Sequence, residues 1–299
     1  MNDKEFGQRV RQLREKAQFT REEFCMDESE LSVRQLTRIE SGTCKPTFSK
    51  INFIANRLSL GLYELMPDYV KLPERYSKLK FDMLRTPTYG DESLVEKRDQ
   101  LISEVYDTYY ADLPEEEQIA VDAFRSTIDT FETKSNTYGK EIIDDYFDQI
   151  LHKTRYTIND LLIIRLYLEH LRADDGTSIN FKKFLELVEH LPGQVDIMDA
   201  NELFILRDVM LVTAGELGRT KQFAPIPSLF QALDQVMIIT QDFQKKPILN
   251  LLKWKYELYV NNDYESAKLL FEEAITFANL IGHHYLVDKL NADWVEDNS

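Results

Sequence analysis

Hydrophobic residues recur at intervals of three and four along almost the whole chain, which is the spacing of one face of a helix. Within residues 5–16, for example, Phe6, Val10 and Leu13 share a face and the arginines fall outside it. No segment alternates hydrophobic and polar residues between hairpin turns, as a half-buried strand would. The pattern therefore predicts an all-α protein.

Helix start and stop signals divide the first 66 residues. Thr20 and Ser32 have the features of N-caps, and Glu23 follows Thr20 at the spacing of a capping box. Gly42 ends the third segment, where a left-handed residue commonly stops a helix. The helices expected here cover residues 5–16, 21–26, 33–40, 47–58 and 62–66.

Pro67 and Pro73 bracket a stiff connector that would end one helical domain and begin another. We therefore expect a head of residues 1–66, a linker of residues 67–73 and a body of residues 74–299. In the body, prolines and glycines separate one helical pattern from the next. The helices expected there cover residues 74–85, 91–111, 115–132, 138–153, 158–172, 179–190, 197–218, 226–242, 246–260, 264–281 and 284–296.

Paired helices of this length suggest a repeat array. The clearest signature resembles the second helix of a tetratricopeptide repeat and consists of Asp263, Tyr264, Ala267, Phe271 and Ala274. The small alanines let helices approach closely, and the phenylalanine fills the gap to the next helix. We expect a right-handed superhelical repeat domain; a generic helical bundle is the alternative.

Charge supports the division into two domains. The formal net charge is −16, but the first 66 residues carry a net of +1 and the remainder a net of −17. A strongly acidic chain is ordinarily a poor partner for nucleic acid, whereas a near-neutral head with clustered arginines is not. We expect the head and the body to have separate functions.

Composition and motifs exclude several other classes. Glycine (10 residues) and proline (9 residues) are scarce, which argues against β-sandwiches and glycine-looped nucleotide folds. Cys25 and Cys44 are too few for a disulfide framework and suit a reducing cytoplasm. The chain begins with charged residues and has no apolar run of roughly 18–20 residues, so neither a signal peptide nor a membrane span is expected. The five histidines form no HExxH motif or zinc spacing. We expect no enzyme, no cofactor and no metal.

The third expected helix carries the strongest candidate chemistry. Leu36 and Ile39 would face the core, which leaves Arg34, Gln35 and Arg38 on the opposite face. An arginine can pair bidentately with guanine and a glutamine with adenine, each pair giving about 1–3 kcal/mol of discrimination. An ordinary solvated polar face is the alternative interpretation.

The stretches FGQRVRQLREKAQFTREEF and LSVRQLTRIESGTCKP resemble the helix-turn-helix of the XRE/Cro family. The resemblance implies base contacts from Arg34, Gln35 and Arg38. It also implies phosphate contacts from four residues near helix N-termini: Thr20, Arg21, Thr47 and Lys50. One departure is Glu30, which stands where the family usually has a turn glycine.

Several polar residues interrupt apolar helices of the body, where a repeat array would leave a concave groove. The candidates for binding a peptide there are Arg165, Arg207, Asn250 and Lys253. Amides can pair with the backbone of an extended peptide, and cations can pair with its carboxylates. Each of them is also explained as a surface residue or as a member of a buried pair.

The combination of an XRE-type head, a proline linker and a helical-repeat body resembles the peptide-sensing regulators of the RRNPP superfamily from Gram-positive bacteria. The closer likeness is to the Rgg-like competence regulators of the ComR family, in LSVRQLTRIESG, TPTY, EVYDTYYADLPEEE, TINDLLII and KYELYVNN. It implies a cytoplasmic transcription activator that binds a short imported signalling peptide, dimerises and binds an inverted-repeat promoter element of competence genes. A peptide-independent repressor and a repeat-based protein adaptor are the alternatives.

Two further expectations concern the body. The acidic run Glu115, Glu116 and Glu117 begins a helix, and its carboxylates would engage Arg34 and Arg38 in the absence of peptide. The alternative is that these acids simply suit the helix dipole. At the other end of the body, the expected dimer contact consists of Leu286, Leu290 and Trp294.

Overall fold

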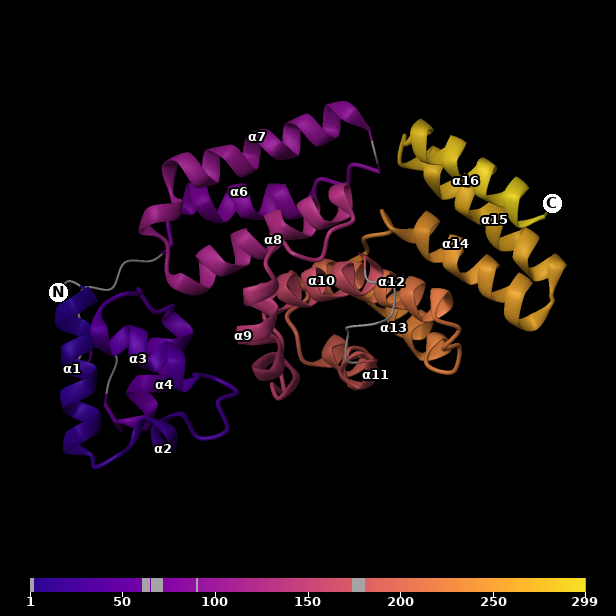
Figure 1. Ribbon diagram of the computed structural model, residues 1–299. Coiled ribbons are helices and arrows are strands. Elements are labelled where there is room, and N and C mark those ends of the chain that lie inside the picture. The colour runs from indigo at the N-terminus through magenta and orange to yellow at the C-terminus, as the bar shows by residue number, and fades with distance from the viewer. Residues whose placement is uncertain (1–2, 61–64, 66–71, 90, 174–180, 299) are drawn as a thin grey trace. The chain divides into compact units, whose positions relative to one another are not determined.

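The computed structural model describes residues 3–60, 65, 72–89, 91–173 and 181–298 (Figure 1). Every regular element in those ranges is helical, and they contain no strand, which confirms the expected all-α class. The chain divides into two compact units. The first comprises residues 1–86 and 96–154, and the second comprises residues 87–95 and 155–299.

The head contributes four helices to the first unit: α1 (Asp3–Lys16), α2 (Arg21–Cys25), α3 (Val33–Ser41) and α4 (Phe48–Arg57). Thr20 and Ser32 both form capping boxes, and Gly42 ends α3 in the left-handed conformation with φ +71°. These caps satisfy backbone groups that a helix end leaves unpaired. The helix expected at 62–66 and most of the expected linker at 67–73 lie outside the described residues.

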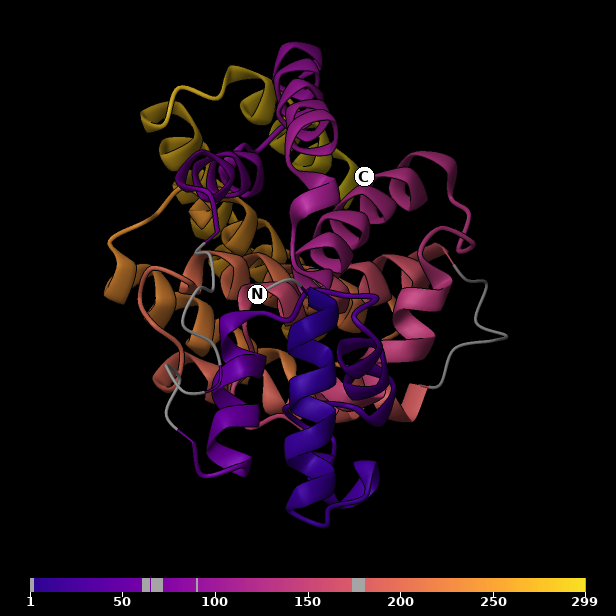
Figure 2. The same cartoon turned by 90° about the vertical axis from the view of Figure 1, so that its left-hand side faces the viewer.

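A close approach of α1 to α3 closes the core of the head. At Gly7, a Cβ atom would lie 2.1 Å from the carbonyl oxygen of Ile39, so only glycine fits between the two helices. The buried apolar side chains around this contact include Phe6, Val10, Phe24, Leu31, Leu36, Ile51 and Ile54. α1 stands in the foreground of the view in Figure 2.

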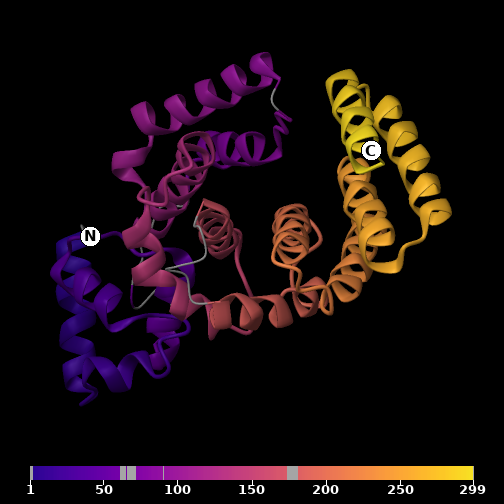
Figure 3. The same ribbon diagram turned by 45° about the vertical axis from the view of Figure 1, so that its right-hand side comes forward.

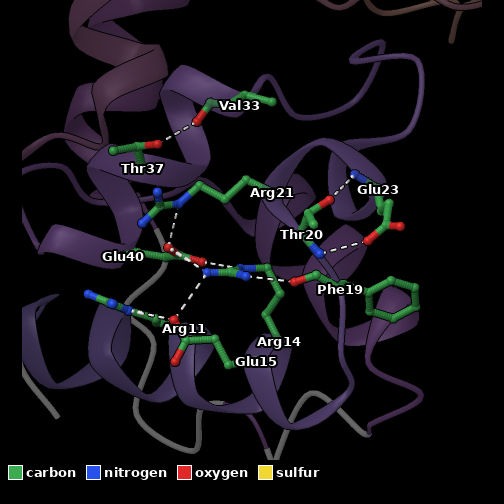
Figure 4. A network of polar contacts seen from close by, with 10 residues as sticks. All are labelled: Arg11, Arg14, Glu15, Phe19, Thr20, Arg21, Glu23, Val33, Thr37 and Glu40. Carbon is green, nitrogen blue, oxygen red and sulfur yellow. Dashed lines mark hydrogen bonds and ion pairs between the residues drawn. The ribbon is translucent and has the colours of Figure 1, made fainter.

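A buried ion pair connects the same two helices (Figure 4). Arg14 of α1 lies 2.5 Å from Glu40 of α3 through its Nε, and it also donates to the backbone oxygen of Phe19 at 2.7 Å. Arg21 of α2 reaches the second oxygen of Glu40 at 2.8 Å. A buried carboxylate with two guanidinium partners is satisfied, whereas one without partners would be costly.

The rest of the first unit is built from α6 (Glu74–Arg85), α7 (Glu92–Thr108) from Glu96 onward, α8 (Glu115–Thr133) and α9 (Lys140–Leu151). The helix expected at 91–111 stops at Thr108, and a 3-10 turn at Tyr110–Asp112 leads to Pro114, which precedes α8. Proline disfavours a helical conformation in the residue before it, and Leu113 is accordingly extended. Tyr76, Leu79, Val105 and Val121 pack into one buried cluster.

The second unit contains α10 (Ile158–Ala173), α11 (Phe181–His190), α12 (Leu203–Arg219), α13 (Ile226–Thr240), α14 (Lys246–Tyr256), α15 (Tyr264–Leu280) and α16 (His284–Asp297). α10 contacts α12, α12 contacts both α13 and α14, and α15 contacts both α14 and α16 (Figure 3). This stacking of helix pairs is that of a repeat array. The helix expected at 197–218 begins only at Leu203, because turns occupy residues 197–202 after a 3-10 turn at Pro192–Asp196. The break expected at Gly176 lies outside the described residues.

The repeat signature of α15 has its expected packing. Ala267 and Ala274 are fully buried, and the ring of Phe271 stacks on that of Trp294 with centroids 4.6 Å apart. Leu286 and Leu290 are buried in the same cluster, so the three residues expected to form a dimer contact pack within their own chain. In this single chain the apolar face of α16 caps the last repeat. The dimer contact stays a prediction, and it would require α16 to be exchanged between two chains.

Candidate functional site

The exposed face of α3 presents two arginines, one helical turn apart. The side chains of Arg34 and Arg38 are 57% and 41% exposed. Gln35 does not lie with them, since it is only 4% exposed. Its Oε1 accepts hydrogen bonds from the backbone N–H of Ser32 at 3.1 Å and from Nζ of Lys50 at 2.8 Å. The prediction that Gln35 projects from this face is therefore wrong, because the capping box turns its amide back towards the helix start.

Carboxylates of α8 and α9 pair with both exposed arginines. Arg34 pairs with Asp145 of α9, and Arg38 pairs with Glu115, the first residue of α8. The hydrogen bond to Asp145 raises the pKa of Arg34 above its usual value. Tyr146 lies among these charges, and burial together with the carboxylate of Glu115 raises its pKa to about 12. Both arginines of α3 thus have acidic partners within the first unit.

Residues at and just before the start of α4 also contact the first turn of α8. Glu116 accepts a hydrogen bond from the hydroxyl of Thr47 at 2.8 Å and pairs with Nζ of Lys50 at 2.9 Å. The backbone N–H of Glu115 donates to the carbonyl of Lys45 at 3.0 Å. We call Glu115, Glu116 and Asp145 the carboxylate clamp. Lys50 is only 5% exposed, so it is not free to reach a phosphate in this arrangement.

Glu117 does not belong to the clamp. It accepts a hydrogen bond from the hydroxyl of Tyr76 at 2.7 Å and pairs with Lys80 at 2.6 Å, both of α6. Three consecutive helical residues point in directions about 100° apart and cannot all face the same neighbour. The expected pairing of the acidic run with Arg34 and Arg38 is therefore present only between Glu115 and Arg38. It is wrong for Arg34, which pairs with Asp145, and for Glu116 and Glu117, which have other partners. Asp145 was missed, because one aspartate on an acidic helix carries no distinguishing sequence signal.

The two remaining phosphate candidates have partners inside the head. The hydroxyl of Thr20 accepts from the backbone N–H of Glu23 at 3.1 Å, which is the capping function. Arg21 pairs with Glu40 while its side chain stays 35% exposed. Both residues lie at the start of α2, where exposed N–H groups can attract an anion.

The four predicted peptide-binding residues form bonds between helices or within them. Arg207 pairs with Asp208 and Asp242, each at 3.1 Å, and is 2% exposed. Other partners are Glu273 for Asn250, Asp234 for Lys253 and Glu169 for Arg165. Burial lowers the pKa of Arg165, although the carboxylate of Glu169 opposes this effect. The prediction that these side chains line an open groove is wrong for buried Arg207 and Asn250, since buried polar groups need such partners.

A cavity of about 620 Å³ lies elsewhere in the second unit, between α12, α13 and α14. Its lining residues are Ala214, Gly215, Gly218, Arg219, Lys221, Phe223, Ile226, Phe230, Leu252, Lys255, Tyr256, Tyr259 and Val260. The small residues of α12 leave the space open, since a Cβ atom at Gly218 would meet nothing within 4 Å. We call this cavity the α12–α14 pocket. The two glycines three residues apart within an apolar helix were the signal that could have predicted it.

A π-helical turn contributes to the lining of the α12–α14 pocket. α14 continues into a π-helical turn at Glu257–Asn261, which supplies Tyr259 and Val260 to the lining. Single π-helical turns within α-helices occur frequently at functional sites. Among the described residues there is no cluster of three or more metal-ligating side chains and no helix long and apolar enough to cross a bilayer.

A helix-turn-helix head and a body of stacked helix pairs with a pocket define a transcription regulator of the tetratricopeptide class. The family model described as ComR tetratricopeptide matches residues 73–294. The crystal structure of ComR from Streptococcus suis is 58% identical over 100% of this chain and 97% of that chain, with a TM-score of 0.84. The chain therefore belongs to the ComR family of competence regulators.

Two further solved structures are similar over nearly their whole length. The apo form of ComR from Streptococcus vestibularis is 30% identical over 99% of this chain and 98% of that chain, with a TM-score of 0.84. ComR from Streptococcus thermophilus, in complex with DNA and its signalling peptide ComS, is 28% identical over 98% of this chain and 100% of that chain, with a TM-score of 0.68. Among curated protein sequences no match to the chain was found.

Proposed function

We propose that this chain is a cytoplasmic, peptide-activated transcription regulator of competence genes. In this proposal α3 binds promoter DNA through Arg34 and Arg38, and the α12–α14 pocket receives part of a short signalling peptide. The relative from S. thermophilus, which was crystallised with DNA and ComS, supports both partners. An apolar pocket of several hundred Å³ with a few charged groups is the usual form of a ligand site.

The pairing of both α3 arginines with the carboxylate clamp is the observation that carries the proposal. A guanidinium that is bound to a carboxylate cannot donate the same N–H groups to a base. Exposed pairs contribute only about 0.2–1 kcal/mol each. Glu115 is largely buried, so the whole clamp provides a few kcal/mol, which would keep the released state to about 0.1–10% of molecules.

Activation then requires the peptide to bind the released state more tightly than the clamped state, because a ligand shifts an equilibrium only through such a difference. Release would make α3 available to the major groove. A homodimer would place two copies of α3 on half-sites about 34–36 Å apart, or a multiple of that distance, as an inverted repeat requires.

A gel-shift titration of labelled competence-promoter DNA tests the proposal, with wild-type protein and the double variant Glu115→Gln, Asp145→Asn. We expect the variant to bind DNA without peptide and the wild type to need it. Asp144→Asn is the matched control, since Asp144 is an exposed neighbour on α9. Absence of any shift, for every protein and with or without peptide, would favour a protein adaptor over a regulator.

A further inference from the structure

A hydrogen-bonded cluster joins the last turn of α7 to the second turn of α8. Asp122 of α8 accepts hydrogen bonds from the hydroxyl of Tyr106 at 2.8 Å and from that of Tyr110 at 2.6 Å, one on each carboxylate oxygen. The two rings stack with their centroids 4.9 Å apart. All three residues belong to the first unit. We call Tyr106, Tyr110 and Asp122 the tyrosine–aspartate cluster.

Both hydrogen bonds of this cluster are of the strong kind. A hydrogen bond to an ionised acceptor is roughly twice as strong as one between neutral groups. Burial and the carboxylate of Asp122 raise the pKa of Tyr106 and that of Tyr110 well above the usual value for a tyrosine. The two hydroxyls therefore stay protonated at neutral pH and remain donors.

The cluster fixes the turn that leads into α8. Tyr110 begins the 3-10 turn, and Leu113, which follows it, is buried in an apolar cluster of α6, α7 and α8 residues. Nε2 of Gln118 donates to the backbone oxygen of Tyr110 at 2.7 Å. Gln118 and Asp122 follow Glu115 by three and by seven residues, so the three side chains share one face of α8. The turn is therefore held against the face of α8 that carries Glu115.

The first turn of α8 has no cap of its own. Pro114 occupies the N-cap position and cannot supply the side-chain hydrogen bond that a serine or threonine would give. The contacts of Glu116 with Thr47 and Lys50 are 2.8 and 2.9 Å long. The backbone N–H of Glu115 donates to a carbonyl of the head at 3.0 Å. Hydrogen bonds are lost beyond about 3.5 Å, so a displacement of this turn by about 1 Å would open these contacts.

We propose that Asp122 is a positioning residue of the carboxylate clamp: through the two tyrosines it fixes the start of α8, from which Glu115 and Glu116 reach the head. This inference rests on the proposed function. It adds a group of residues that influences DNA binding only through the clamp.

Two variants break the cluster from opposite sides. The double variant Tyr106→Phe, Tyr110→Phe removes both hydroxyls and keeps both rings, so the apolar packing of the turn is retained. Asp122→Ala removes the acceptor and keeps both tyrosines. Tyr109→Phe is the matched control. Tyr109 packs against the same apolar cluster, and its hydroxyl forms no hydrogen bond within the part of the chain that the structure describes.

The experiment measures fluorescence anisotropy of the full chain with fluorescein-labelled duplex DNA from a competence-gene promoter, in the absence of peptide. Each change is made in the wild type and in the clamp-free triple variant Glu115→Gln, Glu116→Gln, Asp145→Asn. In the wild type we expect both cluster variants to bind DNA about threefold to fivefold more tightly, which is the effect of one net hydrogen bond on an equilibrium. In the triple variant we expect no further increase, because residues that act through the clamp have nothing left to position. Tyr109→Phe should bind DNA like its parent in both backgrounds.

The other outcomes overturn the inference and separate it from the proposed function. Unchanged DNA binding of both cluster variants, while the triple variant binds more tightly than wild type, would overturn the inference alone. An equal gain in both backgrounds would show that the cluster acts without the clamp, and an equal loss in both would show that it only supports the fold. Absence of DNA binding by every protein, the triple variant included, would overturn the proposed function and the inference with it.

Discussion

Arg38 of α3 and Glu115 at the first position of α8 form an ion pair within the first unit. Glu115 lies in the first turn of α8, where a negative charge also suits the dipole of its own helix. The two explanations of the acidic run are therefore compatible at this residue, since one carboxylate serves both the helix and the clamp. The partners in the clamp also differ in burial, and this difference allows their contributions to be ranked.

Replacing Glu115 by Gln should increase DNA binding without peptide more than replacing Asp145 by Asn. The side chain of Glu115 is 7% exposed and that of Asp145 is 32% exposed, so solvent screens the second pair more strongly. We expect an increase of about tenfold for Glu115→Gln and about twofold for Asp145→Asn, measured by fluorescence anisotropy with promoter DNA. Glu132→Gln, at an exposed site near the end of α8, is the control. The reverse ranking would contradict the role of burial.

Removal of the Arg34 side chain should weaken binding to the specific promoter sequence by about 1–3 kcal/mol, which is the value of one bidentate base contact. Peptide affinity should not fall, because Arg34 lies in the first unit and the α12–α14 pocket lies in the second, and because loss of the pair with Asp145 favours the released state that binds the peptide more tightly. The two affinities are measured by anisotropy for Arg34→Ala and wild type. Loss of both the DNA affinity and the peptide affinity would show that Arg34 is needed for folding.

The Gln35→Ala variant tests whether Gln35 supports the fold of the head or contacts bases. Its amide oxygen takes part in the capping box of α3 and accepts a hydrogen bond from the buried Lys50. We therefore expect a loss of about 1–2 kcal/mol in the free energy of unfolding of the head. Urea titration followed by circular dichroism measures it. Base preference in a panel of mutated promoters should remain that of the wild type. A changed preference with unchanged stability would restore Gln35 as a base-reading residue.

A large side chain at Gly218 should fill the α12–α14 pocket. Because a Cβ atom there meets nothing within 4 Å, Gly218→Leu can be accommodated by the helix while it occupies the cavity. We expect peptide affinity to fall by at least about tenfold with little change in melting temperature. Gly193→Leu is the control, since the space around Gly193 is equally open and lies outside the pocket lining. Unchanged affinity would place the peptide elsewhere.

Gly7→Ala should destabilise the head severely. The added methyl group would lie 2.1 Å from the carbonyl oxygen of Ile39, and neither helix backbone can give way cheaply. We expect a loss of about 1–3 kcal/mol or more, as for other overpacked cores. Thermal unfolding with Gly193→Ala as the control measures the effect. A wild-type melting temperature would mean that α1 and α3 can move apart.

The helices were predictable because their signals are local. Apolar spacing, the capping residues Thr20 and Ser32, and the stop at Gly42 all act within one or two turns, and the structure has each of them. One misplaced boundary occurs where a 3-10 turn replaces the end of an expected helix, at Tyr110–Asp112, and another where turns replace the start of one, at residues 197–202. Such turns use the same residue types as an α-helix, so periodicity does not distinguish them.

The sequence by itself determined the helical class, the helix caps and the arginines of α3, because spacing along the chain encodes which residues share a helical face. Only the tertiary structure decided that Asp145 pairs with Arg34, that Gln35 and Arg207 are buried, and that a pocket opens between α12 and α14. Those outcomes depend on which residues of distant helices come to lie opposite one another. That choice is made by the packing of whole helices, which no local pattern specifies.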